Sequence, residues 1–229
     1  MLNRAYIYAI FLTLILSTSA VRADEISETI ERGDQAYNLG RFERAIFEYR
    51  YALTLPGPHI PRMHYNIGVC RYKLGQLREA ADAYRQAISL RSRQYPSASY
   101  ALGIALQELG EMREALQMFS EAVEASGGKH AEALFELGLA SQKAGENHQA
   151  AAFYQRAIVQ SKDRIPACHN NLGVIMAASG RMDEAMREFE IALKMSKGKF
   201  KEARENITRC RGLISGSSGP LLAATSAHN

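Results

Sequence analysis

The chain has 229 residues, of which 47% are hydrophobic and 23% are charged. Its formal net charge is +4 at pH 7, and the balance becomes more even once residues 1–23 are left out. Such a balance does not indicate a nucleic-acid-binding protein, because these proteins neutralise phosphates with an excess of lysine and arginine. Beyond the N-terminal run, no segment is long and apolar enough to span a membrane.

The first 23 residues have the pattern of a signal peptide. Arg4 precedes an apolar run over residues 5–16, and small polar residues then lead to Val21-Arg22-Ala23. Valine at the third place and alanine at the last place before a cut indicate cleavage after Ala23. We therefore expect export to a bacterial periplasm, with secretion as an alternative. A second alternative is an uncleaved anchor over residues 5–21, which would be the only membrane contact.

From residue 26 onward, one pattern recurs every 35 residues and fills five units. Apolar residues spaced by three and four predict two helices in each unit, joined by a turn. Five positions are kept throughout: a glycine within the first helix, a glycine at the turn, two alanines and an aromatic residue. The first glycines are Gly33, Gly68, Gly103, Gly138 and Gly173; the turn glycines are Gly40, Gly75, Gly110, Gly145 and Gly180; the alanines are Ala45, Ala80, Ala115, Ala150 and Ala185, then Ala52, Ala87, Ala122, Ala157 and Ala192; the aromatic residues are Tyr49, Tyr84, Phe119, Tyr154 and Phe189.

The first glycine of each unit needs a packing reason, because a glycine within a helix costs about 1 kcal/mol relative to alanine. We expect the missing side chain to let the second helix approach closely, with the small alanine facing the gap. The aromatic residue is then expected to fill the space between one unit and the next. The glycine at the turn suits the left-handed backbone that ends many helices.

This frame resembles the tetratricopeptide repeat (TPR). The resemblance implies an all-α fold, a right-handed α-solenoid of five helix-turn-helix units, although the period exceeds the usual 34 residues by one. A helix over 200–214 is expected to cap the last unit. The tail over 215–229 is rich in glycine and serine and is expected to be disordered. Gly127-Gly128 is the expected hinge. The units are 26–60, 61–95, 96–130, 131–165 and 166–199.

The sequence contains no pattern of catalytic chemistry. It lacks the common nucleophile, phosphate-binding and metalloprotease motifs, and no nucleophile is paired with a base. The six histidines do not form a metal-ligand set. Cys70 is expected in the core, and pairing of Cys168 with Cys210 stays open, with three free thiols favoured. We therefore expect a protein that is not an enzyme and that holds no metal or cofactor.

The resemblance implies a partner-binding groove, lined by the first helix of each unit. In the TPR family this wall binds extended peptides or helices of partner proteins. The charges along it are mixed, and they do not form the lysine–asparagine–arginine set that holds a C-terminal carboxylate in some members. Aromatic residues at one position in successive units are compatible with binding or with packing, and both alternatives stay open. The groove residues that we expect are Tyr37, Tyr65, Asn66, Tyr72, Tyr100, Phe135, Asn170 and Asn171.

The sequence favours an exported interaction scaffold or adaptor, which binds a protein or peptide partner in its groove and serves envelope assembly or secretion. Two alternatives remain. One is a structural protein that forms homo-oligomers by stacking exposed repeat ends or filling a neighbour's groove. The other is a non-catalytic accessory subunit of an envelope enzyme complex.

Overall fold

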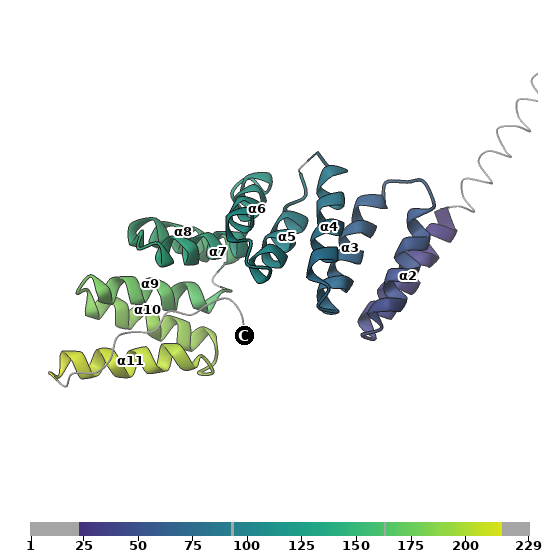
Figure 1. Cartoon of the computed structure of the whole chain (residues 1–229). Coiled ribbons are helices and arrows are strands. Elements are labelled where there is room, and N and C mark those ends of the chain that lie inside the picture. Colours follow the sequence, from purple (N-terminus) through teal and green to yellow (C-terminus); the bar gives the residue numbers. More distant parts are fainter. Residues whose placement is uncertain (1–22, 93, 163, 217–229) are drawn as a thin grey trace, which may run out of the picture. The chain divides into compact units, whose positions relative to one another are not determined.

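The computed structural model describes residues 23–92, 94–162 and 164–216, and within these ranges every regular element is a helix (Figure 1). The N-terminal helix covers residues 23–38 and forms a hairpin with α2. Four further hairpins and a final single helix follow, which confirms an all-α solenoid of helical repeats. The remaining helices are α2 (Phe42–Leu53), α3 (Ile60–Lys73), α4 (Leu77–Ser89), α5 (Pro96–Glu108), α6 (Met112–Ala125), α7 (Ala131–Lys143), α8 (Asn147–Ser161), α9 (Pro166–Ala178), α10 (Met182–Met195) and α11 (Lys201–Ile214).

In each hairpin, a glycine in the left-handed conformation ends the first helix, which we call helix A. Gly75, for example, has φ of 73°. Its amide donates to the carbonyl of Tyr72 at 3.0 Å, and the next amide, that of Gln76, donates to Arg71 at 2.9 Å. Glycine takes this conformation without the steric cost of a side chain, so the predicted turn is confirmed.

The glycine within helix A lies against the aromatic ring of helix B, the second helix of the same hairpin. A Cβ atom added at Gly103 would lie 2.5 Å from Cε1 of Phe119, and one at Gly68 would lie 2.6 Å from the ring of Tyr84. The close approach expected at this glycine is therefore confirmed. The aromatic residue also contacts the next unit, as expected, since the hydroxyl of Tyr154 accepts a hydrogen bond from Asn171. The sequence did not predict that the same ring covers the glycine of its own unit. The ring fills the space that the missing side chain leaves.

The repeated alanines lie in the core. All ten are fully buried at 0% exposure. Small side chains let two helices approach closely and leave few voids at the interface. The sequence pattern thus places the core between the helices of each hairpin.

The described residues divide into two compact units, and we describe each by itself. Unit 1 comprises the chain up to Ser92 together with Glu108–Gly110, and unit 2 comprises the rest. The first boundary follows Ser92, before α5, and the last residue of α5, Glu108, belongs to unit 1. The hinge expected at Gly127-Gly128 stays a prediction. Both of these glycines lie inside unit 2, between α6 and α7, which pack against each other.

The last helix, α11, packs against α10 and α9 within unit 2. Ile207 and Cys210 of α11 join a cluster with Ala185 and Phe189 of α10. The side-chain amide of Asn206 donates to Oδ1 of Asn170 in α9 at 3.0 Å. Both apolar and polar contacts therefore hold α11 on the fifth hairpin, as a capping helix requires.

Parts of both chain ends lie outside the described residues. These are residues 1–22, which hold nearly all of the expected signal peptide, and residues 217–229 of the expected tail. Among the helices that the structure describes, none is long and apolar enough to cross a membrane.

Candidate functional site

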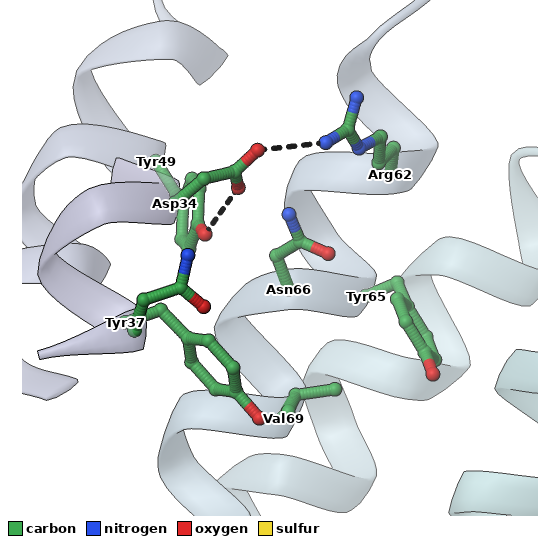
Figure 2. Close-up of a pocket in the computed structure, with 8 residues that line it drawn as sticks. Asp34, Tyr37, Tyr49, Arg62, Tyr65, Asn66 and Val69 are labelled. Atoms are coloured by element: carbon green, nitrogen blue, oxygen red, sulfur yellow. Dashed lines mark hydrogen bonds and ion pairs between the residues drawn. The ribbon is translucent and has the colours of Figure 1, made fainter. Parts of the chain in front are cut away.

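A hollow of about 390 Å³ lies within unit 1, between the first hairpin and α3 (Figure 2). Three lining residues come from the N-terminal helix, one from α2 and four from α3, so the hollow requires two successive repeats. The lining residues are Asp34, Tyr37, Asn38, Tyr49, Arg62, Tyr65, Asn66 and Val69.

Asp34 organises the polar side of this hollow. Its Oδ1 accepts a hydrogen bond from the hydroxyl of Tyr49 at 2.7 Å, and its Oδ2 accepts one from Nη2 of Arg62 at 2.9 Å (Figure 2). Arg62 and Asp34 have opposite charges, so the hollow carries a neutral ion pair. The side chain of Arg62 is still 56% exposed, so part of its guanidinium faces solvent.

The hydroxyl of Tyr49 is held in its neutral form. Burial raises the pKa of Tyr49 far above its ordinary value, and the hydrogen bond to Asp34 raises it further. A hydrogen bond with the Asn66 amide lowers this pKa in part. Tyr49 thus remains a hydrogen-bond donor at neutral pH and holds the Asp34 carboxylate in place.

Two half-buried tyrosines and Val69 supply the apolar part of the hollow. The ring of Tyr37 packs on Phe42 with the ring centroids 5.6 Å apart. The ring of Tyr65 packs on Tyr84 at 5.7 Å. Each tyrosine is therefore supported on one side by the core and remains partly open to solvent on the other, as a preformed anchor surface requires.

The sequence-predicted groove residues of unit 1 do not all meet in the hollow. Tyr37, Tyr65 and Asn66 line it together. Tyr72 lies further along α3 and does not line it; its hydroxyl donates to the carboxylate of Glu108. Burial raises the pKa of Tyr72 to about 12, with a further contribution from Glu108.

In unit 2, Tyr100 is half-buried in α5, whereas Phe135 is 4% exposed in α7. The ring of Tyr100 packs on Phe119 at 5.8 Å and on His130 at 4.9 Å. The ring of Phe135 packs on Tyr154 at 5.8 Å. Phe135 therefore serves packing, because its side chain is enclosed and does not lie on an open wall.

Asn170 and Asn171 are fully buried, which differs from their expected place on an exposed groove wall. They belong to a chain of hydrogen bonds. Nδ2 of Asn170 donates to Oδ1 of Asn171 at 3.2 Å, and Nδ2 of Asn171 donates to the hydroxyl of Tyr154 at 3.3 Å. Tyr154 in turn donates to Oε1 of Gln142 at 2.8 Å. The physical reason is that α11 covers this part of α9, so the two amides serve the packing of unit 2.

The sequence alone did not identify Asn38, Tyr49 or Val69 as part of the site, and it did not identify Asp34 and Arg62 as a pair. One signal was present. Tyr49 precedes Asn66 by seventeen residues, and the same interval separates Tyr154 from Asn171, whose side chains share a hydrogen bond. A tyrosine on helix B followed at this interval by an asparagine thus marks contact between neighbouring repeats.

The described residues offer little for metal or thiol chemistry. No cluster of three or more histidine, cysteine or acidic residues is placed to hold a metal ion in the part of the chain that the structure describes. Cys70, Cys168 and Cys210 are buried free thiols. Burial raises the pKa of Cys70 to about 11 and that of Cys168 to about 12, which keeps both protonated and unreactive at neutral pH.

The sequence was also compared with families of known proteins. The family model described as Tetratricopeptide repeat matches residues 30–99, 100–165 and 142–200. These matches cover most of the chain and include every residue of the hollow. The chain belongs to the tetratricopeptide repeat family.

Solved TPR structures have the same fold. The similarity to MamA has a TM-score of 0.61 and 25% sequence identity, covering 74% of this chain and 96% of MamA. The similarity to PilF of Pseudomonas aeruginosa has a TM-score of 0.70 and 19% sequence identity, covering 86% of each chain. The similarity to YrrB has a TM-score of 0.59 and 22% sequence identity, covering 82% of this chain and 95% of YrrB. The comparison with curated proteins found no significant match.

A TPR fold is that of a scaffold for protein–protein interaction, and TPR proteins bind protein or peptide partners. They are generally non-catalytic. In this TPR protein, the hollow of unit 1 combines half-buried aromatic rings with amide and charged groups from two successive repeats. It is therefore the candidate partner-binding site.

Proposed function

We propose that this TPR protein is an exported adaptor of the bacterial periplasm and that the hollow of unit 1 holds a segment of a partner protein in an envelope assembly. The observation that carries the proposal is the grouping of two half-buried tyrosine rings, two asparagine amides and an oriented arginine around one hollow. YrrB is described as a TPR protein with an unusual peptide-binding site, and peptide binding is the use proposed for the hollow in this chain.

The lining residues indicate what kind of segment fits. The rings of Tyr37 and Tyr65, with Val69, suit an apolar side chain of the partner. The amides of Asn38 and Asn66 each offer donors and an acceptor, which suit the backbone of an extended peptide. Asp34 already neutralises Arg62, so a free carboxylate would have to compete with Asp34. A neutral, partly apolar peptide segment is therefore the favoured ligand.

Capture of partners from the native envelope fraction tests the binding site. The parent protein and Tyr65→Ala are used as baits, and affinity is then measured for the captured partner. We expect Tyr65→Ala to weaken binding by about 1–3 kcal/mol, which is the scale of an interface hot spot. Tyr51→Ala is the matched control, because Tyr51 is 43% exposed on α2 and lies outside the hollow.

Thermal unfolding followed by circular dichroism distinguishes loss of binding from loss of folding. Tyr65→Ala should unfold cooperatively and remain folded at the temperature of the binding assay. Equal affinity of the folded Tyr65→Ala variant and the parent would contradict the assignment of the hollow as the binding site.

Export is a separate part of the proposal and rests on the sequence of residues 1–23. Arg4, the apolar run and Val21-Arg22-Ala23 support it. Mass spectrometry of the protein recovered from the periplasm should find Asp24 as the first residue. Recovery of the chain with Met1 from a membrane fraction would instead indicate an uncleaved anchor.

A further inference from the structure

The last helix, α11, occupies the place of a helix A, but within the described residues no helix B follows it. Thr208 lies 35 residues after Gly173, so it holds the position of the glycine that packs under an aromatic ring in the five hairpins. Thr208 is exposed. The side of α11 that corresponds to the helix-packing side of every earlier helix A therefore faces solvent.

Basic residues lie along this exposed side of α11. The side chain of Lys201 is 81% exposed and lies 3.7 Å from Glu205. That of Arg211 is 68% exposed, and its contact with Glu190 is long, at 4.0 Å. Arg204 is also exposed, and it donates to the carbonyl of Gly198 at the start of the helix. Together with Thr208, these residues are spaced three, four and three residues apart along α11, which places them on one face of the helix. We call Lys201, Arg204 and Arg211 the basic stripe.

Acidic residues form a matching stripe on the N-terminal helix. Asp24, Glu28 and Glu31 recur at four and three, and all three are exposed. The side chain of Glu28 is 74% exposed, and its contact with Arg32 is long, at 3.9 Å. We call these three residues the acidic stripe. It lies on the side of the N-terminal helix opposite the buried Thr29, Gly33 and Ala36.

The two stripes have the same length along a helix. Arg204 and Arg211 are seven residues apart, and so are Asp24 and Glu31. Seven residues span about 10.5 Å at the rise of an α-helix. Two such helices lying side by side can therefore bring both ends of the two stripes into register. This match favours a second copy of the chain over an unrelated acidic partner.

We propose that the protein self-associates head to tail, with the basic stripe of α11 on one copy docked against the acidic stripe of the N-terminal helix on the next. Such an interface uses two different surfaces, so each added copy leaves both kinds of stripe available at the ends of the assembly. The number of copies in an assembly therefore grows with protein concentration. Because the paired groups are exposed charges, salt weakens the association.

Sedimentation equilibrium of the protein as purified from the cells that make it measures the association. The mean mass should rise with concentration at about 0.05 M salt and fall toward that of one chain at about 0.5 M, where screening is stronger. Two charge-reversed variants are compared with the parent: Glu28→Lys with Glu31→Lys, and Arg204→Glu with Arg211→Glu. Each should associate at least about tenfold more weakly, because attraction between the stripes becomes repulsion.

Mixing the two variants provides the decisive comparison. In the mixture each reversed stripe meets a stripe of opposite charge on the other variant, so association should return. Arg78→Glu with Arg113→Glu is the matched control, since both arginines are exposed and lie outside the stripes; it should behave like the parent. A parent that remains a single chain at all concentrations would overturn the proposal. So would association that neither reversal weakens, or a mixture that does not recover.

Discussion

Substitution of Gly103 by alanine tests the contact on which every hairpin depends. The added Cβ atom would lie 2.5 Å from Cε1 and 2.7 Å from Cδ1 of Phe119. Both distances are far below van der Waals contact, so either the ring or the helix must move. Phe119 is only 1% exposed, and a ring in a close-packed core has little space into which it can move.

Two effects of opposite sign set the size of the change. Alanine is favoured over glycine within a helix by about 1 kcal/mol. Overpacking of a filled core costs about 1–3 kcal/mol. We therefore expect Gly103→Ala to lower the free energy of unfolding by up to about 2 kcal/mol. When Phe119→Ala has removed the ring, the same substitution should be stabilising by about 1 kcal/mol.

A double-mutant cycle measures the contact directly. Urea unfolding followed by circular dichroism is recorded for the parent, for each single variant and for the pair, with Phe119→Ala alone expected to cost about 3–5 kcal/mol. The interaction energy should be about 1–3 kcal/mol. A parallel cycle of Gly103→Ala with Phe153→Ala is the control, because Phe153 lies in another hairpin. If the Gly103 and Phe119 effects add within about 0.5 kcal/mol, the reasoning about ring and glycine is refuted.

Three further predictions address burial. Phe135→Ala should lower the free energy of unfolding by about 3–5 kcal/mol in urea titrations, because its side chain is enclosed. A loss below about 1 kcal/mol would indicate that Phe135 lies on an open groove wall. Cys70 and Cys168 should resist alkylation at pH 8 in the native protein and react once the protein is unfolded. Because burial raises their pKa values in the folded state, their contribution to stability is complete below the ordinary pKa of a thiol and is lost as the pH rises above that pKa. Tyr154→Phe should lower the free energy of unfolding by about 0.5–1.5 kcal/mol at pH 7, because hydrogen bonds of the hydroxyl are lost. Since burial raises the pKa of Tyr154, the variant should also lose less stability than the parent as the pH rises above 10.

The candidate site could be read from the sequence only in part. Tyr37, Tyr65 and Asn66 were identified because they hold fixed positions on helix A, where the repeat period alone defines a face. Asp34 and Arg62 could not be recognised as a pair, because they lie 28 residues apart on different repeats and no other unit repeats them. Phe135 showed the limit of the same argument. One repeat position is half-buried at Tyr65 and enclosed at Phe135, since exposure depends on the neighbouring helices as well as on the face.

By itself the sequence determined the hairpins, their turns and the alanine core. These features follow from local backbone preference and from a period that repeats the same small contacts five times. Only the tertiary structure decided that each aromatic ring covers the glycine of its own unit, that Asp34 joins Tyr49 to Arg62, and that α11 encloses Asn170 and Asn171. The physical reason is that a helical face is fixed by residues three and four apart, whereas its partner is fixed by the packing of segments far apart in the chain.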